Sequence, residues 1–339
     1  MATNYDGVRY DASAKHGHVE SYFLKANDPK SRRAVWLKTT IYAGDRDPQR
    51  AVAEAWAVAF DGRGEGGEHV AVKANVPFDS ARFDPSQMKV DVDGCTFERG
   101  SAHGKIETGD RTIAWDFAFD AGGAPLVHFP RAWMYEAPFP SSKIVSPLPD
   151  IRVSGEMTVN GAKWTLDRWP GLLGHNWGRS HAELYAWGHC NLWDDGGAGA
   201  DELVFEGTSA RVRVGRGKLS VLAPMMSILC VRHRGVRYDL NGAIDLVKNR
   251  GEITARRWRF RGKNALVAVE GEMWGETDDF VGLFYANPDG AMTHCLNSKI
   301  AHARIDVTPR GRAPIRLRTR SAALEIGTRD PSHGVRMYV

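Results

Sequence analysis

The most informative part of this sequence is Gly174-His175-Asn176-Trp177-Gly178, which is followed shortly by the stretch His181 to Trp193. With the two-residue period of a β-strand, residues 181–193 divide into two unlike faces. One face carries large or hydrogen-bonding side chains: His181, Glu183, Tyr185, Trp187, His189, Asn191 and Trp193. The other carries smaller apolar ones: Ala182, Leu184, Ala186, Gly188, Cys190 and Leu192. The pattern predicts a strand whose small face packs in a core and whose aromatic face lines a ligand cavity.

The same stretch has a simpler interpretation, in which Trp187 and Trp193 belong to the core. His181 and His189 would then be hydrogen-bonded to neighbouring groups. Every buried polar group needs a hydrogen-bond partner. A core would have to supply partners for a whole face of such groups, so the pattern favours a face that lines a cavity.

Strand patterns recur along the chain, separated by turns rich in Gly, Asp, Asn and Pro. Residues 51–60 place Ala at every second position and alternate it with Val, Glu, Trp and Phe. Alanine favours helices, but the valine and aromatic alternation favours a strand. Asn160-Gly161 is typical of a type I′ hairpin turn. Residues 128–150 contain five prolines, which predicts a connector rather than a helix or a central strand.

These patterns predict an all-β fold with few short helices. Two antiparallel β-barrel halves pack together in this interpretation, as a diverged duplication. Residues 1–135 form the first half, residues 136–150 the connector and residues 151–339 the second half.

Composition limits the classes of function. The chain has 339 residues, of which 42% are hydrophobic and 25% charged, so it is globular rather than disordered. A net charge of +4 does not indicate a nucleic-acid partner, and the arginine-rich runs 256–261 and 316–320 fit the outer faces of strands. No segment is apolar for long enough to cross a membrane. Residues 1–20 lack a signal-peptide core, and the four cysteines have no zinc spacing. We therefore expect a cytoplasmic protein with reduced, buried thiols, for which a homodimer is left open.

Several enzyme classes lack their signatures here. The chain has no Gly-x-Ser-x-Gly nucleophile elbow, no His-Glu-x-x-His zinc helix and no dinucleotide-binding glycine motif. His175, His181 and His189 could supply three imidazoles, but their spacing matches no standard metal motif. We therefore expect neither a metal nor a cofactor.

Short runs of this sequence resemble the AttH-type lipocalin-like group. Its relatives include carotenoid hydratases, tocopherol cyclases and lipocalin-like Diels–Alderases. The runs are Lys143-Ile144-Val145-Ser146-Pro147, Val153-Ser154-Gly155, Gly171 to Gly178 with His181 and Trp187, and Leu296-Asn297-Ser298-Lys299. The resemblance spans about residues 140–215 and 290–305. It implies two lipocalin-like barrels that meet face to face, with a ligand site near their junction. It does not imply one reaction.

The central stretch and the resemblance together suggest an enzyme that acts on an apolar, unsaturated isoprenoid or polyketide-like molecule in a barrel cavity. Hydration, cyclisation or isomerisation would begin with a proton from a buried acid. Glu183 and Glu206 are the candidate acids, with His181 to position the acid or carry its proton. The expected ligand-binding residues are His175, Asn176, Trp177, Tyr185, Trp187, His189, Trp193 and Asn297.

Three alternatives stay open. A pericyclic cyclisation would depend on the shape of the cavity rather than on an acid. A non-catalytic carrier or sensor of an apolar ligand would use the same aromatic walls. The Gly174–Gly178 motif and Asn297 also fit a purely structural role, in which Trp177 plugs the end of a barrel.

Overall fold

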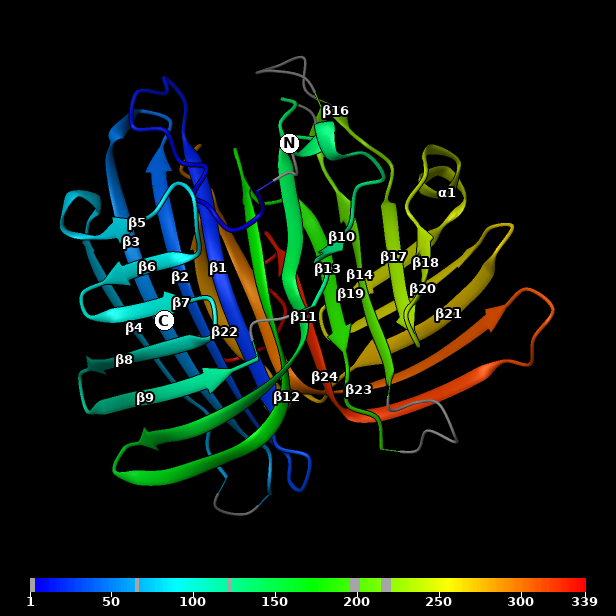
Figure 1. Ribbon diagram of the computed structural model, residues 1–339. Helices are drawn as coiled ribbons and strands as arrows, with labels where there is room; N and C mark the ends of the chain where they lie inside the picture. The colour runs from blue at the N-terminus through cyan, green and yellow to red at the C-terminus, as the bar shows by residue number, and fades with distance from the viewer. Residues whose placement is uncertain (1–3, 65–66, 121–122, 139, 195–201, 215–220) are drawn as a thin grey trace.

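The computed structural model describes residues 4–64, 67–120, 123–138, 140–194, 202–214 and 221–339. Two curled antiparallel sheets stand side by side, one built from the first half of the chain and one from the second (Figure 1). Each sheet is half of a barrel. The predicted all-β, two-part architecture is confirmed.

The first sheet has 12 strands in the order β4-β3-β2-β1-β12-β11-β9-β8-β7-β6-β5, with β10 paired to β11. The strands are β1 (His18–Asn27), β2 (Arg33–Gly44), β3 (Asp47–Asp61), β4 (Val70–Pro77), β5 (Arg82–Phe83), β6 (Lys89–Val92), β7 (Cys95–Glu98), β8 (Ser101–Thr108), β9 (Arg111–Phe119), β10 (Leu126–Val127), β11 (Ser142–Val159) and β12 (Ala162–Gly178). Two short 3-10 turns, η1 (Phe78–Ser80) and η2 (Ala132–Tyr135), lie in its connections.

The second sheet has 10 strands in the order β18-β17-β14-β13-β24-β23-β21-β20-β19, with β22 paired to β23. The strands are β13 (Leu184–Cys190), β14 (Leu203–Arg211), β17 (Met226–His233), β18 (Val236–Leu240), β19 (Arg250–Thr254), β20 (Arg257–Lys263), β21 (Val267–Trp274), β22 (Val281–Ala286), β23 (Met292–Pro309) and β24 (Ile315–Thr328). The helix α1 (Ala243–Lys248), the 3-10 turn η5 (Thr277–Asp279) and the small hairpin β15 (Arg213–Val214) with β16 (Val221–Leu222) complete this half.

The two sheets share one connection pattern. Each begins with four strands that pair in sequence, β1 to β4 in the first sheet and β13, β14, β17 and β18 in the second. Each also has a long hairpin, β11–β12 or β23–β24, whose inner strand pairs with the first strand of its sheet. Bulges interrupt the pairing in both hairpins. The repeated strand order supports the duplication that the patterning suggested.

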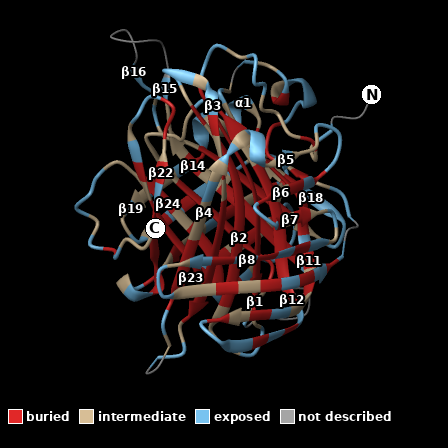
Figure 2. Ribbon diagram, turned by 90° about the vertical axis from the view of Figure 1, so that its left-hand side faces the viewer, coloured by how far each residue is buried: buried red, intermediate tan, exposed pale blue. Residues whose placement is uncertain are grey.

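The three largest apolar clusters among the described residues hold the fold together. One fills the concave side of the first sheet, where Leu37, Ala55 and Ala57 are buried. A second fills the concave side of the second sheet, around Ala186 and Cys190. A third lies between the two sheets and includes Trp36, Trp56, Phe60 and Trp187. The strands are therefore buried along their middle parts while the connecting loops are exposed (Figure 2).

Residues 51–60 form part of strand β3, as predicted. Their alanines pack into the first core, while Trp56, Val58 and Phe60 face the second sheet. The free cysteines are all buried: Cys95, Cys190, Cys230 and Cys295.

The prediction that residues 128–150 hold no central strand is wrong. Residues 142–150 begin strand β11, which lies between β9 and β12. Its pairing with β12 shifts between Val145 and Leu148 and again between Leu148 and Ile151. These irregularities accommodate Pro147 and Pro149, which cannot donate a backbone hydrogen bond. The chain changes sheets later than the expected connector, between Gly178 and Leu184.

The turn at Asn160-Gly161 has the backbone of the predicted type I′ hairpin, with φ of 48° and 84°. The glycines of the central motif lie inside strand β12 and not in turns. A Cβ at Gly174 would lie 2.2 Å from the Phe23 ring, and one at Gly178 would lie 2.4 Å from the Ser141 carbonyl oxygen. These glycines let neighbouring groups approach the strand closely.

Candidate functional site

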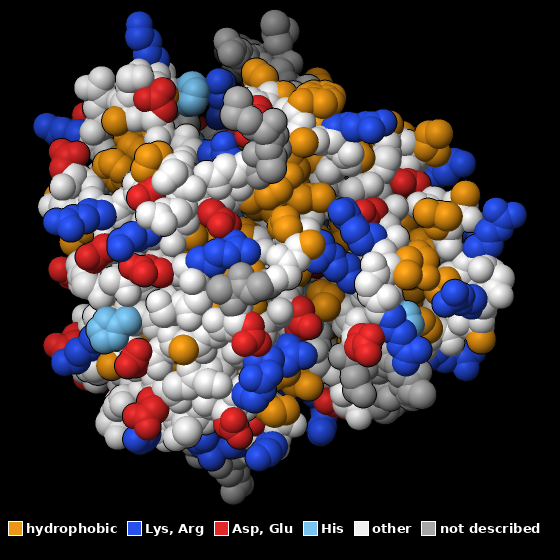
Figure 3. All heavy atoms as spheres, in the orientation of Figure 1, with side chains coloured by type: hydrophobic (Ala, Val, Ile, Leu, Met, Phe, Trp, Pro, Cys, Tyr) orange, Lys and Arg blue, Asp and Glu red, His pale blue; other side chains and the backbone are white. Residues whose placement is uncertain are grey.

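A cavity of about 300 Å³ lies at the junction of the two half-barrels. The first sheet contributes Phe23, Trp36, Lys38, Ile144, Asn176 and Trp177, and the second contributes Tyr185, Trp187, Thr208, Ile228, Tyr285 and Glu325. Phe129, Met134, His181 and Leu246 close it from the connecting segments and α1. Hydrophobic side chains gather between the two halves on the face shown in Figure 3. The cavity therefore lies between the two half-barrels, near the junction at which the resemblance implies a ligand site. It is not enclosed within one barrel, because the concave sides are filled by their own cores.

The alternation along β13 produces the predicted separation of faces. Ala186 and Cys190 pack into the second core, where a Cβ at Gly188 would lie 2.4 Å from Met273 Sδ. Tyr185 and Trp187 point the other way and line the cavity. The small face thus lets β13 approach its own core closely, and the aromatic face forms the wall at the junction.

Glu206 lies behind the Trp187 indole and is fully buried. Its Oε1 accepts hydrogen bonds from Trp187 Nε1 at 3.0 Å and from Ser146 Oγ at 2.9 Å, and His128 Nε2 lies 3.3 Å away. Burial alone would raise the pKa of Glu206, but the His128 imidazole and these donors outweigh it and lower the pKa to about 2. The carboxyl is therefore ionised, and it is not the protonated acid that we expected from its burial.

Glu183 lies outside the cavity. Its carboxylate pairs with Arg213 Nε at 3.2 Å and with Arg329 Nε at 3.6 Å. The expectation that Glu183 shares the cavity face is wrong because strand β13 begins only at Leu184. Before that residue the chain does not follow the two-residue period that placed Glu183 beside Tyr185.

His181 lines the cavity from the segment before β13. Its backbone N–H donates to Asn287 Oδ1 at 2.9 Å, and its ring Nδ1 lies 3.2 Å from the same oxygen. Asn287 Nδ2 donates to Thr293 Oγ1 and to the Ala291 carbonyl, which fixes Oδ1 as the acceptor. Nδ1 of His181 therefore carries the proton and Nε2 the lone pair. Burial, together with the nearby Lys38 ammonium, lowers the pKa of His181 to about 3, so the ring is neutral.

Glu325 on β24 is the carboxylate that lines the cavity, and sequence reasoning missed it. Its Oε1 accepts a hydrogen bond of 2.8 Å from the buried Lys299 Nζ, which also donates to Asn297 Oδ1. Burial lowers the pKa of Lys299, although Glu325 acts in the opposite direction. Asn297 is buried and is not among the residues that line the cavity, so its contact with Lys299 positions the cation beside Glu325.

Lys38 on β2 is the second group that sequence reasoning missed. Its ammonium lies 3.6 Å from the centroid of the Tyr285 ring, and the side chain lines the cavity. Burial lowers the pKa of Lys38 to about 8, while Glu325 partly offsets this effect. A possible signal was the pair Trp36 and Lys38, which places an aromatic and a cation on one face of a strand.

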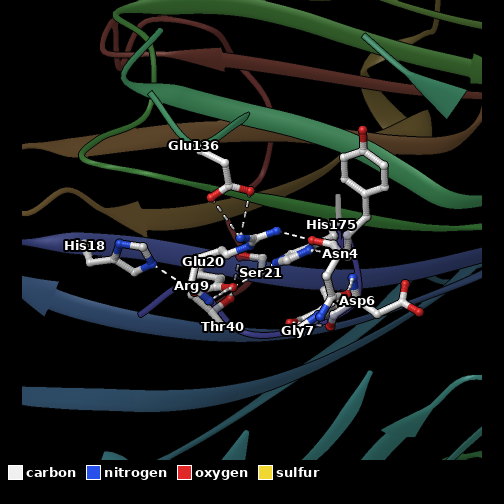
Figure 4. Close-up of polar contacts among 12 residues, drawn as sticks. Asn4, Asp6, Gly7, Arg9, His18, Glu20, Ser21, Thr40, Glu136 and His175 are labelled. Carbon is white, nitrogen blue, oxygen red and sulfur yellow. Dashed lines mark hydrogen bonds and ion pairs between the residues drawn. The ribbon is translucent and has the colours of Figure 1, made fainter. Parts of the chain in front are cut away.

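His175 has a structural position (Figure 4). Its Nε2 lies 2.8 Å from Glu20 Oε1, and its Nδ1 lies 2.8 Å from the Tyr5 carbonyl oxygen. Glu20 also contacts His18 Nε2 at 2.9 Å and accepts two hydrogen bonds from the Arg9 backbone N–H. Burial would raise the pKa of Glu20, but the bonds from His175 and His18 lower it to about 2. This cluster ties the N-terminal segment to β1 and β12.

Of the remaining predicted residues, some line the junction cavity and others are buried in the protein interior. Asn176 and Trp177 line the cavity. His189 Nε2 donates to the Pro149 carbonyl oxygen at 2.9 Å, and its ring is fully buried between the sheets. Trp193 Nε1 donates to the Leu203 carbonyl oxygen, and the indole packs on the second core. Trp193 departs from the predicted face because β13 ends at Cys190.

In the part of the chain that the structure describes, no group of three or more His, Cys, Asp or Glu side chains has the arrangement to hold a metal ion. The helices in this part are also all too short or too polar to span a bilayer.

Known proteins share this architecture. An AttH-type protein of Nitrosomonas europaea aligns with a TM-score of 0.52 at 14% identity, covering 96% of this chain and 99% of that one. Kievitone hydratase of Nectria haematococca aligns with a TM-score of 0.50 at 10% identity, covering 96% of this chain and 94% of that one. These likenesses show the fold.

Sequence relatives extend over the same length. The uncharacterized proteins Rv0493c and MT0513, from two strains of Mycobacterium tuberculosis, are each 24% identical over 335 residues, covering 92% of this chain and 90% of the relative. The sequence pattern of the tocopherol cyclase-like family matches residues 130–328, which include β11 to β14 and both strands of the β23–β24 hairpin. The resemblance to the AttH-type group is thereby confirmed, and the chain belongs to the tocopherol cyclase-like family.

Proposed function

We propose that this protein is an enzyme that hydrates or cyclises an apolar, unsaturated small molecule in the cavity between its two half-barrels. The single observation that carries the proposal is that Glu325 and His181, two groups able to exchange protons, line one largely apolar cavity. The family description names a cyclase, and one structure of the same fold is a hydratase. Both reactions add an O–H group across a carbon–carbon double bond when the nucleophile is water or a hydroxyl of the substrate.

Glu325 is the group that we assign to proton transfer. Lys299 Nζ lies 2.8 Å from its Oε1 and holds the carboxylate in place at the cavity wall. In this scheme Glu325 takes the proton from the attacking water or hydroxyl as its oxygen bonds to one carbon. Glu325 then returns that proton to the other carbon, so atoms and charge balance. His181, neutral with its Nε2 lone pair, is the second base that reaches the cavity.

The aromatic walls hold and orient the apolar part of the substrate. Phe23, Trp187 and Tyr185 lie on the two sides of the junction. The ring of Phe23 meets that of Trp187 edge to face with centroids 5.5 Å apart. This wall excludes bulk water, which protects the reaction from competing proton transfer.

The test is a turnover screen by liquid chromatography and mass spectrometry. The purified protein is incubated with unsaturated isoprenoid phenols, hydroxylated enones and unsaturated acids, and products are sought that have gained one water or have cyclised without a change of mass. Glu325→Gln should abolish turnover of any compound that reacts. Glu183→Gln is the matched control, because Glu183 lies outside the cavity, and it should leave turnover unchanged.

Two outcomes would overturn the proposal. Equal turnover rates in the wild type and in Glu325→Gln would show that Glu325 does not transfer the proton. Stoichiometric binding of compounds that are all recovered unchanged would favour the alternative, a carrier or sensor that uses the same aromatic cavity.

A further inference from the structure

Lys38 differs from the other buried lysines in what surrounds its ammonium. Lys25 Nζ donates to Asn27 Oδ1 and Asn191 Oδ1 at 2.9 Å, and Lys299 Nζ donates to Glu325. Lys143 Nζ donates to backbone carbonyl oxygens. Lys38 is 5% exposed, and the described residues offer its Nζ no hydrogen-bond acceptor or ion-pair partner.

Aromatic rings are the neighbours of the Lys38 ammonium instead. Its Nζ lies 3.6 Å from the centroid of Tyr285 and 5.8 Å from those of Trp36 and Trp56. Cation–π contacts of this kind attract an ammonium but accept no hydrogen bond in the way an oxygen does. A buried cation without such an acceptor is costly to the fold.

Trp36 supplies a second unpartnered donor to the same wall. Its indole is 1% exposed, lines the cavity, and has no acceptor for Nε1–H among the described residues. Trp36 and Lys38 are two residues apart on β2, so their side chains leave the strand on one face. The cavity wall therefore carries two adjacent donors that the protein itself does not satisfy.

The charged groups that face Lys38 do not neutralise it. Glu325 from β24 is paired with Lys299, and Glu54 from β3 is paired with Lys73 from β4 at 2.7 Å. Burial raises the pKa of the Cys295 thiol on β23 to about 12, and His181 is neutral, so neither group adds a negative charge. Lys38 is thus left as a net positive charge in an apolar wall.

We propose that Lys38 Nζ and Trp36 Nε1 bind an anionic oxygen at the head of an otherwise apolar substrate, a carboxylate or an enolate. The inference rests on the proposed function only in that both use the same cavity. The apolar part of the molecule would lie toward Phe129, Ile228 and Leu246. An enolate oxygen arises when water or a hydroxyl adds to a double bond conjugated with a carbonyl group, because the electron pair of the double bond moves to that oxygen. The preferred substrate class is therefore an apolar conjugated carbonyl compound or acid.

Two probes of equal chain length test this inference without turnover: dodecanoate and dodecan-1-ol. Isothermal titration calorimetry should show that the wild type binds dodecanoate about tenfold or more tightly than the alcohol near neutral pH. Lys38→Met should abolish that preference. Lys73→Met is the matched control, since Lys73 also lies over Trp56, at 4.1 Å, but does not line the cavity, and it should retain the preference.

A pH series on the wild type provides the same information without a variant that could fail to fold. The preference for dodecanoate should be lost as pH rises through the range of the Lys38 pKa, about 8, because the ammonium loses its proton. His181 and Cys295 do not titrate in that range, with pKa values of about 3 and 12. Equal affinity for acid and alcohol, no binding of either probe, or a preference that survives both Lys38→Met and high pH would each overturn the inference. Turnover that depends on Glu325 would still support the proposed function in those cases.

Discussion

Trp187 Nε1 donates a hydrogen bond of 3.0 Å to Glu206 Oε1, and this bond joins the cavity wall to a fully buried carboxylate. A hydrogen bond to a charged acceptor stabilises the folded state more than one between neutral groups. Its loss leaves the buried charge with too few hydrogen bonds. The relationship gives Trp187 two roles. Its ring lines the cavity at the junction, and its N–H donates a hydrogen bond to the Glu206 carboxylate behind the ring.

Replacing Trp187 with Phe should therefore lower the free energy of unfolding by about 2 kcal/mol, because Glu206 loses a donor that solvent cannot replace. The measurement is urea denaturation followed by circular dichroism. Trp193→Phe is the matched control, since Trp193 Nε1 donates to a neutral carbonyl at 2.9 Å in a partly buried position. It should cost about 1 kcal/mol or less. Equal losses in the two variants would contradict the special role of Glu206.

Stability should fall on acidification in two stages. Burial, with Lys25 nearby, lowers the pKa of His189 to about 3, so the unfolded chain takes up a proton first as pH falls below about 6.5. The pKa values of Glu20 and Glu206 are lowered to about 2, so their stabilisation is present above about pH 4.5 and is lost as pH falls toward 2. Each fully titrating group adds a slope of about 1.4 kcal/mol per pH unit.

Free energies of unfolding measured between about pH 7 and pH 3 check this dependence. His189→Gln should reduce the slope below about pH 6.5, and Glu20→Gln should reduce it only below about pH 4.5. A wild-type stability that stays constant over the whole range would contradict the assigned shifts.

Gly178→Ala should destabilise the protein by about 2 kcal/mol, because the new methyl group meets backbone and cannot rotate away. Its Cβ would lie 2.4 Å from the Ser141 carbonyl oxygen and 2.7 Å from Ser142 Cα. Gly44→Ala is the control, as its Cβ would make only ordinary contacts, with Tyr42 Oη at 3.5 Å and the Pro288 carbonyl oxygen at 3.9 Å. Thermal unfolding should show a clear decrease for the first variant and little change for the second. Similar melting temperatures would show that Gly178 is not required by close approach.

Filling the cavity should block ligand binding without unfolding the protein. Ala210 lines the cavity opposite Tyr185 in the β13–β14 pairing, so Ala210→Trp would occupy the space that the ligand needs. Calorimetry with dodecanoate should show binding weakened by about tenfold or more. Ala265→Trp adds the same indole at an exposed position and should bind as the wild type does. Undiminished binding in Ala210→Trp would place the ligand elsewhere.

Much of the fold was predictable because its signals are local. The alternation in residues 51–60 and 181–193 reflects the fixed geometry of a strand, and Asn160-Gly161 reflects the left-handed backbone of its turn. The Pro-rich start of β11 was not predictable in this way, because bulges at Pro147 and Pro149 depend on pairing with β12. The local sequence does not show that a central strand can contain these prolines.

Part of the cavity wall was predictable from two neighbouring stretches of sequence. Tyr185 and Trp187 followed from the alternation along β13, and Asn176 and Trp177 belong to the Gly174–Gly178 motif. Lys38 and Glu325 were missed because a charged residue in an alternating strand ordinarily faces solvent. Here the convex faces of two sheets cover each other, so those positions are buried at the junction. That burial comes from packing between segments far apart in the chain. The alternation of residues within one strand gives no information about such packing.

A crystal structure of the protein with bound dodecanoate would show directly whether the junction cavity binds an apolar molecule by an anionic head. Electron density for the ligand should lie between the two sheets, with its carboxylate within hydrogen-bond distance of Lys38 Nζ and its chain along Trp187 and Ile228. A ligand inside the concave core of either half-barrel, or in the junction with its carboxylate directed away from Lys38, would contradict this role of the cavity.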